Sequence, residues 1–122
     1  MAIHVLATSI EGTRAALSAV KPIAEQSGLP VVLMIPTEAG HRDANWLVAS
    51  YEQLARDVGQ AVRVRVGVSS NVVASAQMLT ERDSPLVIGG PSRWWWPTAE
   101  ERLAAQLRRA GRDVLFVGCE KA

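Results

Sequence analysis

The chain has 122 residues, of which 48% are hydrophobic and 20% are charged, and its formal net charge is +1. This size and composition suit one globular domain and leave little room for a second, so we expect a single domain over residues 1–122. The small charge excess argues against a nucleic-acid-binding protein, which usually presents a strongly basic face, and a single cysteine excludes an internal disulfide.

The first predicted elements are a strand and a helix. Residues 3–7 form a short apolar run that predicts a strand, and Gly12 lies in the break that follows. Apolar residues at helical spacing then predict a helix that begins near Thr13 and stops at Gly28. Pro22 lies inside this helix, where a proline costs about 3 kcal/mol or forces a kink.

A buried strand and a second helix follow. Residues 31–35 are an unbroken apolar run closed by Pro36, which is typical of a strand covered on both faces, as in parallel sheets. Residues 44–58 predict a helix that stops at Gly59. The expected inner side of this helix carries Trp46, Leu47, Ser50, Leu54 and Val58.

The middle of the chain contains two further strands and a helix. Valines alternate with Arg63, Arg65 and Gly67 over residues 62–68, which predicts a half-exposed strand at an edge of the sheet. Residues 71–79 predict a third helix, and residues 85–88 a buried strand stopped by two glycines.

The last helix has the clearest boundaries. Thr98 and Glu101 have the spacing of a capping box, and Gly111 stops the helix predicted over residues 98–110. Residues 114–117 predict the final strand. Strands that alternate with helices indicate an α/β fold, a three-layer domain in which helices cover both faces of a five-stranded, mainly parallel sheet.

Ligands of such sheets bind beyond the carboxyl ends of the strands, near the point where the strand order switches. The residues at those ends are Thr8, Ser9, Ile35, Pro36, Gly89, Gly90, Ser92 and Arg93. Glycines after a buried strand allow backbone N–H groups to approach a phosphate, and Arg93 adds a positive charge. The same residues also suit a plain turn from strand to helix, and their spacing does not decide between the two.

Three consecutive tryptophans, Trp94, Trp95 and Trp96, follow this turn. They either cover the end of the sheet or form an aromatic anchor for a protein partner or a flat ligand. The sequence contains no nucleophile elbow, P-loop or dinucleotide fingerprint, and His4 and His41 lack the spacing of metal ligands. Catalytic and metal-binding residues are therefore not predicted.

The arrangement resembles the universal stress protein family over nearly the whole chain. The segments that carry the resemblance are residues 5–17, 86–90 and 107–117. Residues 87–94 also resemble the universal-stress-like domain of potassium-sensing histidine kinases, in which a basic and aromatic segment follows the glycine turn. The resemblance implies an adenine nucleotide alpha hydrolase-like fold and a homodimer joined through the last strand.

The ATP-binding members of this family have an Asp after the first strand, then Gly-x-x-Gly and, further on, Gly-Ser or Gly-Thr. Here the Asp position is Thr8, the second glycine position is Ser92 or Arg93, and the later pair falls near Glu100 and Glu101. Two carboxylates would repel a phosphate chain. We therefore expect a degenerate ATP-binding motif.

The leading hypothesis is a non-catalytic stress-response or regulatory module in the cytoplasm, with no signal peptide and no membrane span. It would act by self-association and by binding a protein partner through Trp94–Trp96. The alternative is a protein that binds AMP, ATP or a cyclic dinucleotide in an open cleft between Thr8 and Gly89. A weak nucleotide hydrolase is a third hypothesis.

Overall fold

A computed structural model of the chain describes residues 2–37, 44–68, 84–91 and 98–119. Its sheet has five parallel strands in the order β3-β2-β1-β4-β5, which confirms the predicted α/β class and a parallel sheet. The strands are β1 (Ile3–Leu6), β2 (Val31–Thr37), β3 (Arg63–Val68), β4 (Leu86–Pro91) and β5 (Val114–Cys119).

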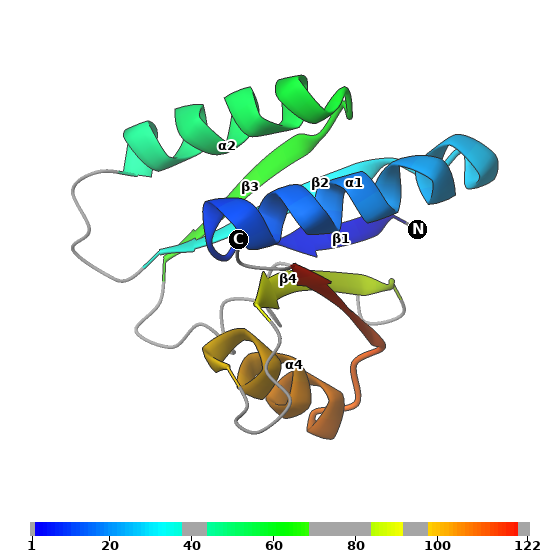
Figure 1. Ribbon diagram of the computed structural model, residues 1–122, viewed down its shortest axis with the longest axis vertical. Coiled ribbons are helices and arrows are strands. Elements are labelled where there is room, and N and C mark those ends of the chain that lie inside the picture. The colour runs from blue at the N-terminus through cyan, green and yellow to red at the C-terminus, as the bar shows by residue number, and fades with distance from the viewer. Residues whose placement is uncertain (1, 38–43, 69–83, 92–97, 120–122) are drawn as a thin grey trace.

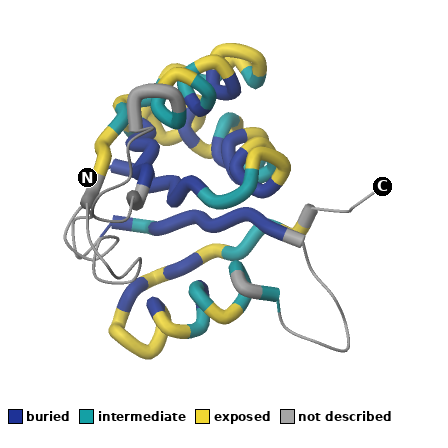
Figure 2. Tube along the Cα trace, turned by 90° about the vertical axis from the view of Figure 1, so that its left-hand side faces the viewer, coloured by how far each residue is buried: buried dark blue, intermediate teal, exposed yellow. Residues whose placement is uncertain are grey.

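Helices cover both faces of this sheet. The helices α1 (Ile10–Ser27) and α2 (Ala44–Val58) lie on one face, and α4 (Ala99–Arg109) lies on the other (Figures 1 and 2). The predicted helix over residues 71–79 lies outside the described residues. The three described layers agree with the architecture expected from the sequence.

Each face of the sheet has its own apolar core, because successive strand residues point to opposite sides. Val5, Leu33 and Val87 pack toward α1 and α2. Leu6 and Met34 pack toward the face that α4 covers. The central strands are therefore buried on both faces, as their unbroken apolar runs predict.

The start of α1 differs from the prediction. The helix begins at Ile10, and Ser9 rather than Thr13 is the N-cap, since the Ser9 hydroxyl accepts a hydrogen bond of 3.1 Å from the Gly12 N–H. Thr13 is fully buried inside the helix. The predicted stop is confirmed, because Gly28 has φ 71° and its N–H donates to the Ala24 carbonyl.

The buried side of α2 also differs in part from the prediction. Among residues 47–58, whose side chains are described, Tyr51, Leu54 and Ala55 are buried and Ser50 is half-buried. The side chain of Trp46, also expected on this side, is not described. Leu47 and Val58 pack partly against the same core, as expected. Tyr51 was absent from the predicted set, although its spacing from Leu47 and Leu54 places it in the middle of the apolar stripe.

Two strands run past their predicted ends, because β2 continues through Pro36 and β4 continues through both glycines that were expected to stop it. The start of the last helix is as predicted. The Thr98 hydroxyl accepts from the Glu101 N–H at 3.3 Å, and the Glu101 carboxylate accepts from the Thr98 N–H at 3.1 Å, so the predicted capping box is present. β3 is an outer strand of the sheet, as its alternating valines and arginines predict.

Candidate functional site at the carboxyl ends of β1 and β4

The strand order switches between β1 and β4. From β1 the chain adds β2 and β3 on one side of the sheet, and later adds β4 and β5 on the other. The helices that follow β1 and β4 lie on opposite faces of the sheet, with α1 above and α4 below (Figure 2). Ligand sites of parallel sheets are found at this kind of position.

Thr8 and Gly89, both predicted as site residues, are in direct contact there. The Thr8 hydroxyl donates a hydrogen bond of 2.7 Å to the Gly89 carbonyl oxygen. The backbones of Gly12 and Gly89 also touch: a Cβ atom on Gly89 would overlap the Gly12 carbonyl oxygen and lie 2.7 Å from its carbon. The direct gap between Thr8 and Gly89 is therefore closed, and a ligand would have to lie beyond this contact.

A buried hydrogen-bond network fixes the loop that follows β1. The Thr13 hydroxyl accepts from the Thr8 N–H at 3.0 Å, and the Tyr51 hydroxyl donates to the Thr8 carbonyl. Burial raises the pKa of Tyr51 above its usual value, and a hydrogen bond with Thr13 opposes this rise in part. Thr8 is thus held through its N–H, its carbonyl and its side chain.

The second glycine of the predicted phosphate turn lies against a carboxylate side chain. Gly90 is buried, and a Cβ atom on it would lie 2.7 Å from both Cβ and Cγ of Glu100. Glu100 is in the first turn of α4, where a negative charge interacts favourably with the helix dipole. The same charge would repel a phosphate brought to Gly90.

The other predicted ligand residues have varied positions. The Ser9 hydroxyl is used as the N-cap of α1. Ile35 is 2% exposed, and its side chain belongs to the core beneath α1 and α2. Pro36 is in β2, but its side chain is not described. Ser92, Arg93 and the three tryptophans Trp94–Trp96 lie outside the described residues.

Three solved structures show what this fold is similar to. A universal stress protein in complex with cAMP has a TM-score of 0.63 and 15% sequence identity, with 97% of this chain and 98% of that chain covered. The universal stress protein from Archaeoglobus fulgidus has a TM-score of 0.65 and 18% sequence identity, with 96% of this chain and 93% of that chain covered. A universal stress protein family member from Burkholderia pseudomallei has a TM-score of 0.58 and 16% sequence identity, with 95% of this chain and 96% of that chain covered.

The chain has the universal stress protein fold. The architecture implied by the sequence resemblance is therefore confirmed along nearly the full length. No protein-family model matches the sequence, and no curated protein does.

Within this universal stress protein fold, sequence reasoning missed several residues of the candidate site. Gly12, Thr13 and Tyr51 join Thr8 and Gly89 in one contact network. Gly12 gave a signal, because a glycine inside a helix start often marks a close backbone approach. The sequence gives no such signal for the hydrogen bond from the Tyr51 hydroxyl to the Thr8 carbonyl.

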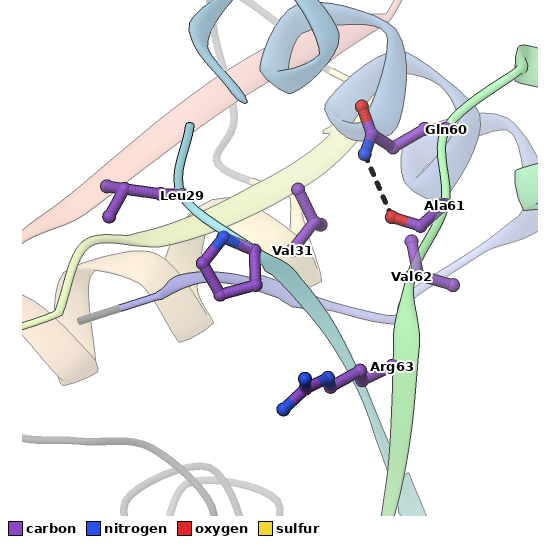
Figure 3. A pocket seen from close by; sticks show the side chains of 7 residues that line it. Leu29, Val31, Gln60, Ala61, Val62 and Arg63 are labelled. Carbon is purple, nitrogen blue, oxygen red and sulfur yellow. Dashed lines mark hydrogen bonds between the residues drawn. The ribbon is translucent and has the colours of Figure 1, made fainter. Parts of the chain in front are cut away.

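Two surface hollows lie at the opposite end of the sheet. One of about 310 Å³ lies between the starts of β2 and β3, where Leu29, Pro30 and Val31 face Gln60–Arg63 (Figure 3). A second of about 200 Å³ adjoins it beside α2. The Gln60 amide donates to the Ala61 carbonyl at 2.8 Å at the rim of both hollows. Both hollows are at the amino ends of these strands, away from the switch point.

Neither a metal centre nor a membrane helix is found in residues 2–37, 44–68, 84–91 and 98–119. No three His, Cys, Asp or Glu residues of these ranges are grouped so that they could hold a metal ion. No helix within them is both long and apolar enough to cross a membrane.

Proposed function

We propose that this protein is a non-catalytic stress-response or regulatory module with a degenerate nucleotide site, which acts in the cytoplasm by self-association and partner binding. The observation that supports this proposal best is the pair of contacts at the switch point. Thr8 is hydrogen-bonded to Gly89, and Glu100 lies against Gly90. The Thr8 hydroxyl and the Gly90 backbone, which would face a nucleotide, are instead in contact with other residues of the protein.

A nucleotide titration tests the degenerate site. We expect no saturable change in tryptophan fluorescence with ATP, because the Glu100 carboxylate repels a phosphate at Gly90. Glu100→Ala should raise the affinity for ATP at least about tenfold, which corresponds to about 1.4 kcal/mol. Glu25→Ala removes the same charge from the exposed far part of α1 and should change nothing. Tight binding of ATP by the wild type would refute the degenerate site.

A second candidate function is the binding of an adenine nucleotide with few phosphates. It is favoured by the likeness to a universal stress protein solved in complex with cAMP. AMP or a cyclic dinucleotide would bring fewer charges to Glu100 than ATP, and Thr8, Ser9 and Gly89 would line the site. Saturable binding of AMP or cAMP that is lost in Thr8→Val would establish this function in place of the first.

Self-association is best supported at β5. This outer strand, Val114–Cys119, contains no charged residue, and its Leu115 side chain is 49% exposed. The other outer strand, β3, carries Arg63 and Arg65, which are both exposed. Two copies paired through β3 would bring arginines close together, whereas two β5 strands meet without charge repulsion. We therefore propose a homodimer through β5.

A charge placed on β5 should break this dimer. Leu115→Lys introduces an ammonium group that the interface would bury, so the dimer dissociation constant should rise at least about tenfold. Val66→Lys is the matched control, because Val66 lies on the other outer strand and is 39% exposed. Sedimentation equilibrium measures both variants. An unchanged dimer in Leu115→Lys would show that β5 is not the interface.

A further inference from the structure

The larger of the two hollows lies between the starts of β2 and β3, where the two segments are not yet paired. The register of β2 with β3 begins at Val32↔Arg63, so residues 29–31 and 60–62 before it are not paired with one another. The space between them, about 310 Å³, is at the lower end of the range of about 300–1,000 Å³ for small-molecule sites. Its size therefore suits a small organic molecule.

The walls of this hollow are mainly apolar. Leu29 and Val62 line it from its two sides (Figure 3); both are half-buried and pack partly against the core beneath α1 and α2. Pro30, directly before β2, also lines the hollow and is exposed. A hydrocarbon group that displaces water from these side chains would be stabilised by the hydrophobic effect.

Arg63 supplies the only charge among the seven residues that line the hollow. Its side chain is exposed and extends from β3 toward β2 (Figure 3). No hydrogen bond or ion pair joins it to another residue of the described parts of the chain. A guanidinium has a planar set of N–H groups that matches the two oxygens of a carboxylate. The hollow therefore combines apolar walls with a group that recognises carboxylates.

The charges around the hollow favour an anion. The carboxyl-terminal end of α2 carries a partial negative charge, but the Lys21 ammonium donates to the Val58 carbonyl at 3.4 Å and offsets this charge. The smaller hollow is lined by both Glu52 and Arg56, whose opposite charges give it no preference for either sign. Arg63 therefore makes the larger hollow the one that prefers an anion.

We propose that the larger hollow binds a small apolar carboxylate, such as a short-chain fatty acid. The carboxylate accepts hydrogen bonds from the Arg63 guanidinium, and the hydrocarbon part lies against Leu29, Pro30 and Val62. This site is at the amino ends of β2 and β3, away from the switch point, and β5 is at the far side of the sheet. It therefore adds to the proposed function and does not depend on it.

A titration of the full chain with hexanoate, followed by NMR chemical shifts of the backbone amides, tests the proposal. We expect saturable shifts in Leu29, Val31 and residues 60–63, with millimolar affinity because the ligand has few atoms. Arg63→Gln removes the charge and should weaken binding at least about tenfold. Arg63→Lys keeps the charge without the planar fork, so its affinity should fall between the two. Arg14→Gln is the matched control, because it removes the same charge from an exposed position near the start of α1, and it should bind like the wild type.

Two further probes separate the charge from the hydrocarbon. Hexanamide keeps the hydrocarbon chain without the charge, and acetate keeps the charge without most of the chain, so each should bind at least about tenfold more weakly than hexanoate. Equal binding of either probe overturns the proposal, as does a hexanoate titration that gives no saturable shifts or shifts only residues away from the hollow. Glu100→Ala and Leu115→Lys should bind hexanoate normally, so failure of the degenerate site or of the β5 dimer would be seen separately.

Discussion

Gly89→Ala should lower the free energy of unfolding by about 3 kcal/mol, the upper part of the range for overpacking in a close-packed interior. The added methyl group would overlap the Gly12 carbonyl oxygen and lie 2.7 Å from the Gly12 carbonyl carbon and 3.2 Å from the Ala16 Cβ. Two of these three neighbours are backbone atoms, which cannot rotate away as the end of a flexible side chain can. β4 and the start of α1 would have to separate.

Gly28→Ala is the matched control for this variant. Gly28 has a left-handed φ of 71°, and apart from its neighbours along the chain no atom of the described residues lies within 4 Å of the position that a Cβ would take. The substitution should cost only the strain of that conformation, about 1 kcal/mol. Denaturant unfolding of both variants and the wild type gives the comparison. Equal losses in the two variants would show that the contact between Gly12 and Gly89 is not tight.

Much of the fold could be predicted from the sequence because the signals are local. The capping box at Thr98 and Glu101 needs only four consecutive residues, and the stop at Gly28 needs one. The alternation of valine and arginine in β3 indicates a half-exposed strand, and β3 is an outer strand of the sheet. Each of these features is determined by residues that are close together in the sequence.

The start of α1 could not be predicted so well, because Ser9 and Thr13 are both suitable N-cap residues. Tertiary contacts decide between them. Thr13 is fully buried and its hydroxyl accepts the Thr8 N–H, which keeps it inside the helix, whereas the Ser9 hydroxyl remains available to Gly12. The sequence pattern contains no information about this burial.

The candidate site was predicted in outline only. Parallel-sheet topology brings Thr8 and Gly89 to the same edge, and this part of the prediction rests on a general rule about strand ends. The distance between the two residues depends on Gly12, whose missing side chain allows α1 to touch β4. The open cleft that the nucleotide-binding hypothesis predicted between these two residues is bridged by a hydrogen bond.

The hydroxyl of Tyr51 should stabilise the folded state at neutral pH and lose part of this effect in alkali. Tyr51→Phe keeps the buried ring but leaves the Thr8 carbonyl without this donor, which should lower the free energy of unfolding by about 1–2 kcal/mol at pH 7. Tyr51 is the only tyrosine in the sequence, so the change in absorbance on formation of tyrosinate reports on this residue and on no other tyrosine.

The stabilisation by the Tyr51 hydroxyl should decrease with rising pH. Burial raises the pKa of Tyr51 in the folded state, so the unfolded state releases the phenolic proton first, at its usual pKa of about 10. The Tyr51 hydroxyl therefore contributes its full stabilisation of the folded state below that pH, and this stabilisation falls as the pH rises toward the pKa of Tyr51 in the folded state. The difference in stability between wild type and Tyr51→Phe should therefore narrow above about pH 10. A constant difference from neutral to alkaline pH would mean that the Tyr51 hydroxyl is not buried, and that α2 does not hold the end of β1 through it.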